Sequence, residues 1–152
     1  MAIRYTASTW SGKLSPTNED IGKLAEQSYR ALPQSIHALC GNITLRVEEM
    51  ADIDLIEFLG GTSPYDLMGL FHPVGETFLS SDEQAPDTHL IILYRRAIID
   101  YWAETEDSLD AIVTHVIVQE VGRQFDFDGD QLEEIETSTN QEIERDSKSL
   151  MQ

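Results

Sequence analysis

The stretch SLDAIVTHVIVQEVGRQF, residues 108–125, decides the fold, because its local features support two different structures. The β-branched residues within 113–118 favour a strand by propensity. An apolar side chain nevertheless recurs at every fourth position, which places one stripe along a helix: Leu109, Val113, Ile117, Val121 and Phe125. The stretch is also longer than a typical strand. We therefore predict a buried helix over residues 108–125.

Polar side chains follow a second stripe of this helix. His115, Gln119 and Arg123 are spaced i, i+4 and i+8, and Glu120 lies beside Gln119. In a His-Glu-x-x-His helix, two imidazoles bind zinc and the glutamate activates the metal-bound water. Here the first histidine position holds an amide, which is a weak ligand, and the second holds a permanent cation with no lone pair to donate. The sequence thus predicts the glutamate of a catalytic frame without its metal ligands.

Composition excludes several classes of protein. The chain has 152 residues, 41% hydrophobic and 25% charged, which predicts one soluble domain with a substantial core. A net charge of −18 would repel phosphates, so neither nucleic acid nor an anionic membrane is expected as a partner. Cys40 is the single cysteine and is expected to be a buried thiol. With no secretory leader or 18-residue apolar run in view, we expect a cytoplasmic location.

Local patterns predict the remaining elements. A helix begins near residue 17, where Thr17 and Asp20 have the spacing of a capping box, and Pro33 is expected to end it. Alternating apolar residues predict a half-buried strand over 43–47, and a short helix over 55–59 stops at two glycines. Residues 66–78 suggest a strand or hairpin, and the apolar run 89–94 predicts a central strand.

An acidic region follows the predicted long helix. Residues 126–137, DFDGDQLEEIET, begin like a calcium-binding EF-hand loop, with acids at its first, third and fifth positions: Asp126, Asp128 and Asp130. The sixth position should be glycine and is Gln131, while the twelfth should be glutamate and is Thr137. The sequence therefore argues against an EF-hand. We expect residues 138–152 to form a frayed acidic and polar tail of a single domain spanning 1–152.

Residues 15–136 resemble a known family over segments that occur in the same order. These segments are LAEQSYRALP, CGNITLRVEE, SPYDLMGLFHPVG, HLIILYRRAIIDYWAET, VTHVIVQEVG and LEEIE. The chain is similar to a minimal zincin-type family of possible zinc metallopeptidases, whose long helix carries the motif His-Glu-x-Gly-His-His-Phe-Gly. The resemblance implies an α+β fold, with a small mixed sheet packed against the motif helix in one compact domain. It also implies zinc as the family's cofactor.

The same resemblance locates the departures. Glu120 retains the family's catalytic glutamate, whereas Gln119 and Arg123 replace the two histidines. Gln124 stands at the additional histidine, and Asp126 replaces the glycine that lets the chain turn away from the helix. The third ligand position corresponds to Gly129. We therefore expect a vestigial catalytic residue, a degenerate metal site and no bound cofactor. The expected cleft residues are His115, Gln124, Asp126, Asp128 and Asp130.

Three functions remain open on the sequence. The first is a non-catalytic homologue that binds an unknown peptide or protein in the inherited cleft. The second is an active metallopeptidase with unusual ligands drawn from His115, Glu120, Asp128 and Asp130. The third is an acidic protein that binds a basic partner through its charged surface. We also expect Arg123 to replace the missing metal charge in a buried ion pair with Glu120.

Overall fold

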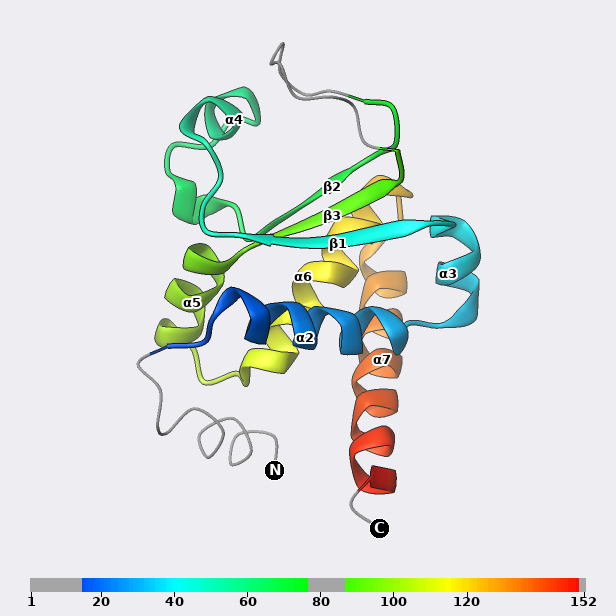
Figure 1. The fold of residues 1–152 in the computed structure, drawn as a ribbon. Coiled ribbons are helices and arrows are strands. Elements are labelled where there is room, and N and C mark those ends of the chain that lie inside the picture. The colour runs from blue at the N-terminus through cyan, green and yellow to red at the C-terminus, as the bar shows by residue number, and fades with distance from the viewer. Residues whose placement is uncertain (1–14, 77–86, 151–152) are drawn as a thin grey trace.

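The computed structural model describes residues 15–76 and 87–150, with helices on both faces of a three-stranded sheet (Figure 1). The sheet contains β1 (Ile43–Glu48), β2 (Gly69–His72) and β3 (His89–Tyr94) in the order β1-β3-β2. β1 runs parallel to β3, and β2 runs antiparallel to it. The apolar run predicted to be a central strand is indeed the middle strand, and the α+β fold with a small mixed sheet is confirmed.

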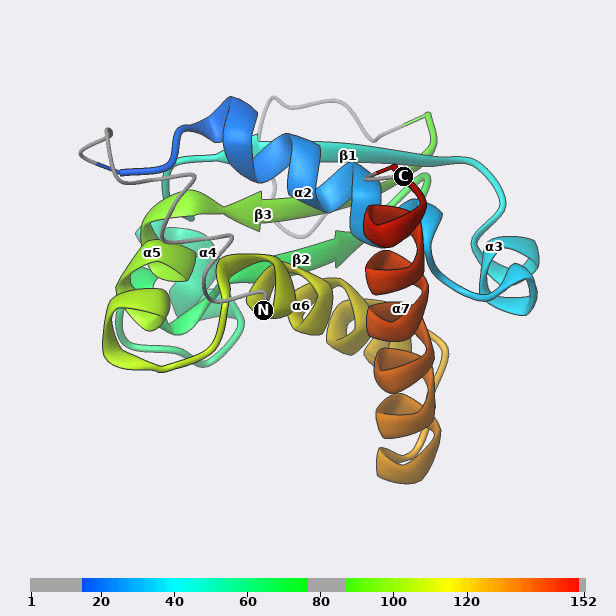
Figure 2. The same cartoon turned by 90° about the horizontal axis from the view of Figure 1, so that it is seen from below.

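The main core lies between the sheet and two helices, α2 (Asn18–Arg30) and α6 (Leu109–Gln124). Figure 2 shows both helices crossing one face of the sheet. The predicted helix over 108–125 is confirmed: the Ser108 side chain accepts the backbone N–H of Ala111, and Phe125 is the C-terminal cap. The β-branched residues of α6 are buried on several sides, so tertiary packing outweighs their strand propensity.

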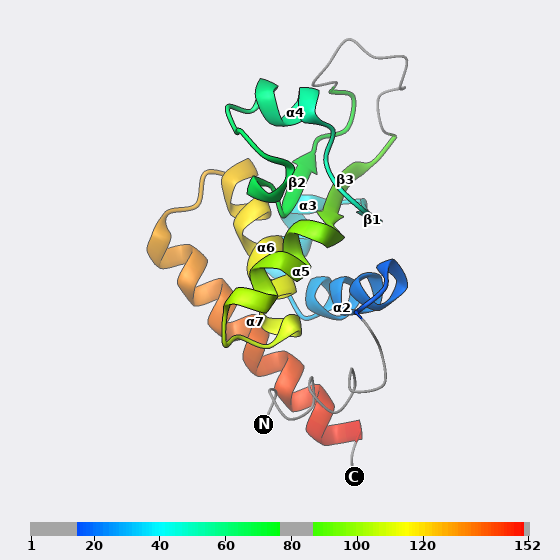
Figure 3. The same cartoon turned by 90° about the vertical axis from the view of Figure 1, so that its left-hand side faces the viewer.

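A smaller core covers the other face of the sheet. It consists of side chains from β2 and β3 together with Ala51, Ala97 and Ile56, the last of which belongs to α4 (Ile53–Phe58). The short 3-10 helix η1 (Pro64–Asp66) contacts α4. In Figure 3 the sheet lies between α4 on one side and α2 with α6 on the other. The short helix before the two glycines is therefore confirmed; it begins two residues earlier and ends one residue earlier than predicted. Of the predicted strand or hairpin at 66–78, residues 69–72 form β2, and residues 77 and 78 lie outside the described residues.

The C-terminal segment corrects one prediction. α7 (Gly129–Leu150) is a continuous helix that packs on α6 and α2, and it buries Thr139 and Ile143. The expected fraying from residue 138 is therefore wrong as far as residue 150, and residues 151–152 lie outside the described part. Polar composition suggested a tail, but apolar and small side chains at four-residue spacing give this helix a buried face. Residues 129–137 are helical too, so they do not form a calcium loop.

Other local predictions are confirmed, and two further α-helices were not predicted. The capping box of Thr17 and Asp20 is present, although α2 already ends before Pro33, which precedes α3 (Gln34–Cys40). Cys40 is buried, and its burial raises the pKa of the thiol. α5 (Arg95–Glu104) directly follows β3, and Arg95 forms an ion pair with Glu49 at 3.0 Å. Among the described residues, no helix is long and apolar enough to cross a membrane.

Candidate functional site

A cleft of about 690 Å³ lies between the edge strand β2 and helix α6. Its apolar part is contributed mainly by the segment from η1 through β2, and its polar part by one face of α6. The lining residues are Leu59, Asp66, Leu67, Met68, Gly69, Leu70, Phe71, Pro73, Glu76, His115, Val116, Gln119, Glu120, Arg123 and Gln124. The volume lies within the range of small-ligand sites in proteins.

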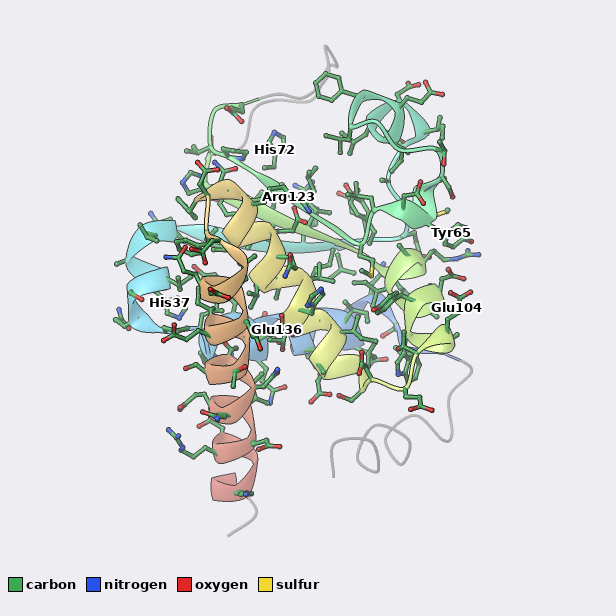
Figure 4. The ribbon with its side chains drawn as sticks, turned by 180° about the vertical axis from the view of Figure 1, so that it is seen from behind. His37, Tyr65, His72, Glu104, Arg123 and Glu136 are labelled. Carbon is green, nitrogen blue, oxygen red and sulfur yellow. The ribbon has the colours of Figure 1, made fainter. Side chains whose placement is uncertain are left out.

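Helix α6 presents its polar stripe to this cleft. His115, Gln119 and Arg123 all line it, as their i, i+4, i+8 spacing requires for residues on one helical face. Glu120 and Gln124 join them from the neighbouring positions. The apolar stripe of the same helix faces the core, so packing of that stripe fixes the direction of the polar one. Figure 4 shows Arg123 near the C-terminal end of α6, close to β2.

Glu120 is the most buried charged group of the cleft, with only 8% of its side chain exposed. Its carboxylate accepts a hydrogen bond from the backbone N–H of Phe71 in β2. Arg123 Nη1 lies 3.1 Å from Glu120 Oε2 and 3.3 Å from Oε1. Burial raises the pKa of Glu120, while Arg123 and the Phe71 N–H lower it, and the net direction is upward. The two partners therefore compensate the buried charge only in part.

The expected buried ion pair is only half buried. The Arg123 side chain is 68% exposed, and one nitrogen of its guanidinium spans both carboxylate oxygens. A guanidinium that remains hydrated gains little from such a contact, typically about 0–1 kcal/mol. Arg123 thus pairs with Glu120 as predicted, but the geometry does not support the larger energy of a fully buried, two-point pair.

Two glycines allow α6 to pack closely against its neighbours β2 and α7. A Cβ added to Gly69 would lie 2.5 Å from Val116 Cγ1, so only glycine allows β2 to approach α6 here. A Cβ added to Gly122 would lie 2.0 Å from Leu132 Cδ2, at the contact between α6 and α7. Phe125 packs against Phe71 in an edge-to-face arrangement with ring centroids 5.9 Å apart. Gly122 and Phe125 therefore have structural roles that do not depend on a metal.

Asp126 occupies a backbone conformation that favours glycine. Its φ of +59° lies in the left-handed region, directly after the last residues of α6. The N–H of Phe127 donates to the carbonyl of Gly122 at 2.9 Å, which is the long bond of a Schellman turn. The chain therefore still makes the turn for which the resemblance implies glycine, at the energetic cost of a side chain in this region.

The candidate metal ligands are not gathered at one point. The ring nitrogen Nδ1 of His115 lies 2.8 Å from Glu136 Oε1 on α7. Asp128 caps α7 through a 2.8 Å bond from the Gln131 N–H, and Gly129 begins that helix. Within residues 15–76 and 87–150, no three histidine, cysteine, aspartate or glutamate side chains are placed to hold a metal ion. An amide, a guanidinium and one carboxylate are a poor donor set for zinc, so the α6 site does not fit a catalytic metal.

The predicted cleft residues therefore separate into two groups. His115 and Gln124 line the cleft, whereas Asp126, Asp128 and Asp130 belong to the turn and the start of α7 and do not line it. Sequence reasoning did not include the contribution of β2, in particular the Phe71 N–H that binds Glu120. The glycine at 69, flanked by apolar residues, was the available signal, because a glycine within a strand often marks a close approach.

Comparison with known proteins identifies the family. A family model described as zincin-like metallopeptidase matches residues 40–139, which is most of the chain and includes β2, the cleft and all of α6. No curated protein matches the chain significantly.

Proposed function

The chain belongs to the zincin-like metallopeptidase family, and from that premise we propose that it is a non-catalytic member that binds a peptide or protein segment in the cleft between β2 and α6. One observation carries the proposal. The glutamate that would activate a metal-bound water is held by Phe71 and Arg123, and the two ligand positions of its helix are filled by Gln119 and Arg123.

Ligand chemistry supports the absence of peptidase activity. A catalytic zinc generally needs three good protein donors and one open position for water. Neither the Gln119 amide nor the Arg123 guanidinium can replace an imidazole, and Gly129 has no side chain to donate. The substitute ligands that would support an active enzyme are dispersed, since His115 pairs with Glu136 and Asp128 caps α7.

The shape of the cleft supports peptide binding. β2 is an edge strand, so its outer side faces the cleft instead of another strand of the described sheet. The bond from the Tyr94 N–H to the Met68 carbonyl fixes the alternation along β2, which directs the backbone groups of Gly69 and Phe71 away from β3. The Phe71 N–H is already taken by Glu120, so an extended peptide in the cleft would form main-chain hydrogen bonds with the other outward backbone groups of this edge.

Metal content and activity test the first half of the proposal. The protein is purified without chelator, and zinc is measured by elemental analysis beside a peptidase assay with zinc added. We expect no stoichiometric zinc and no cleavage. A Gln119→His, Arg123→His double variant serves as a positive control, because it restores two imidazoles at i and i+4 and should bind zinc more tightly. One zinc per wild-type chain, with activity lost on chelation, would overturn the proposal.

Peptide selection tests the second half. A phage-displayed library of random twelve-residue peptides is selected on the wild-type protein, and the dissociation constants of synthetic copies are measured by fluorescence anisotropy. Gln119→Trp places a large side chain in the cleft and should weaken binding at least tenfold. Gln141→Trp is the matched control on the exposed side of α7 and should leave binding unchanged. A library without binders, or binders indifferent to Gln119→Trp, would refute peptide binding in the cleft.

A second candidate function is favoured by the exposed side of α7. Asp130, Glu133 and Glu134 are exposed there on a chain whose net charge is −18, which suits a basic protein partner. Binding of that kind should weaken steeply with salt and should not respond to Gln119→Trp. A protein partner captured from extract at low salt, whose binding survives that substitution, would favour the acidic surface over the cleft.

A further inference from the structure

The cleft holds a buried negative charge that its own cation balances incompletely. Glu120 is largely removed from water, whereas Arg123 remains mostly hydrated and contacts the carboxylate through a single nitrogen. The other cationic candidate in the lining, His115, is directed to Glu136 on α7. The Coulomb attraction of a buried carboxylate is stronger for a cation that is also shielded from water than for a hydrated one.

The remaining charges of the cleft have the same sign as Glu120. Asp66 and Glu76 also line it. The Asp66 carboxylate accepts hydrogen bonds from the backbone N–H groups of Thr62 and Ser63, at 3.0 Å each. Asp66 therefore adds negative charge to the cleft, but its oxygens are less available to bind a ligand. Glu76 is exposed at the rim. The lining therefore has three carboxylates against one guanidinium, and a ligand entering it meets a negative potential.

Arg123 can leave Glu120 without disturbing the fold. The two residues are neighbours at i and i+3 on α6, and the arginine side chain extends from the helix into solvent. Rotation of that side chain would expose Glu120 to an incoming group while the Phe71 N–H continues to hold the carboxylate in place. The intramolecular contact thus resembles a weak occupant of a cation site.

We propose that the cleft recognises a basic side chain of a bound peptide segment, preferably arginine, whose guanidinium replaces that of Arg123 on the Glu120 carboxylate. This inference rests on the proposed peptide-binding function and adds the chemistry of the ligand to it. A guanidinium covered by the walls of the cleft can use two parallel hydrogen bonds to the carboxylate, which the exposed Arg123 does not. Apolar residues of the peptide would contact the exposed or partly exposed side chains of Leu59, Leu67 and Met68.

The experiment uses the peptides selected on the wild-type protein. Each binder that depends on the cleft is resynthesised with citrulline, an uncharged isostere, in place of arginine, or glutamine in place of lysine. The probe is this matched pair of synthetic peptides, measured by fluorescence anisotropy against wild-type protein and Glu120→Gln. The glutamine side chain can still accept the Phe71 N–H, and circular dichroism confirms that the variant is folded.

α7 offers a matched control for the charge. Glu142 and Arg145 form another i, i+3 pair at 2.9 Å, and neither residue lines the cleft. Glu142→Gln removes the same unit of charge from the same kind of pair, so it measures the effect of net charge alone. Arg145→Ala is the corresponding control for Arg123→Ala.

We expect the selected peptides to contain a basic residue and to lose at least tenfold in affinity when that residue is made neutral. Glu120→Gln should abolish this difference, Glu142→Gln should preserve it, and Arg123→Ala should raise affinity for the charged peptide several-fold. Peptides that bind in the cleft equally well with citrulline, or equally well to Glu120→Gln, would overturn the inference while leaving the proposed function intact. Failure of every peptide to depend on the cleft would remove both.

Discussion

Replacement of Thr114 by valine tests how α2 and α6 are joined. Ser28 on α2 and Thr114 on α6 are 1% and 0% exposed, and their hydroxyl oxygens lie 2.7 Å apart. Thr114 also donates to the Asp110 carbonyl at 2.9 Å, so the bond between the helices is donated by Ser28. Valine keeps the volume of threonine but removes the acceptor, which leaves the Ser28 hydroxyl buried without its partner.

The magnitudes follow from which group is left unpaired. Thr114→Val should lower the free energy of unfolding by about 1–3 kcal/mol, the cost of an unsatisfied buried donor. Ser28→Ala should cost less, on the order of 1 kcal/mol, because Thr114 keeps its bond to Asp110. In the double variant no hydroxyl is stranded, so its cost should be close to that of Ser28→Ala alone. The two single costs therefore exceed the cost of the double variant by the whole Thr114→Val cost, which predicts a coupling energy of about 1–3 kcal/mol.

Urea unfolding, followed by both far-ultraviolet circular dichroism and tryptophan fluorescence, measures these differences when the two transitions coincide. Thr137→Val is the matched control, since Thr137 is exposed on α7 and should change stability by no more than about 0.5 kcal/mol. Additive single effects, or a Thr114→Val variant as stable as the control, would show that Ser28 does not depend on this acceptor and would refute the reasoning.

Four further predictions concern the site and its surroundings. Asp126→Gly should raise the free energy of unfolding by about 0.5–1 kcal/mol in urea melts, because the left-handed φ of +59° no longer opposes a side chain; a loss of stability would contradict this. Gly122→Ala should lower the free energy of unfolding by about 1–3 kcal/mol, because the added methyl group overlaps Leu132. In a Leu132→Ala background the overlap is removed, and the same substitution should raise the free energy of unfolding through the higher helix propensity of alanine. An effect of the same sign in both backgrounds would contradict this. Because burial raises the pKa of Glu120 above its ordinary value of 4.5, the folded protein binds a proton more tightly, and the contribution of Glu120 to stability falls as pH rises through the raised pKa. The free energy of unfolding of Glu120→Gln, measured in urea melts relative to the wild type, should therefore increase over that pH range and then level off. A difference that does not change with pH would count against the burial effect. Cys40 should react with a thiol reagent only in unfolding concentrations of urea, as its burial and raised pKa require, and rapid modification of the native protein would contradict that.

The sequence by itself determined the helix that builds the site. Apolar residues at four-residue spacing from Leu109 to Phe125 predict this helix from the local sequence, and that spacing is a stronger signal than the strand propensity of the β-branched residues in the same stretch. The capping residues and the all-apolar central strand were determined in the same way. Loss of the zinc ligands at 119 and 123 was visible too, because ligand chemistry depends on residue type before it depends on geometry.

Only the tertiary structure decided what Glu120 binds and how exposed its partner is. The contact between Glu120 and the Phe71 N–H joins residues far apart in the chain, and no local pattern specifies that pairing. Burial of Glu120 beside an exposed Arg123 likewise depends on which elements surround each side chain, so spacing on α6 predicted the pair but not its partial burial. The long helix α7 is a related case. Its overall composition is polar and predicts a frayed tail, whereas its stability comes from the few of its residues, including Thr139 and Ile143, that pack against α6 and α2.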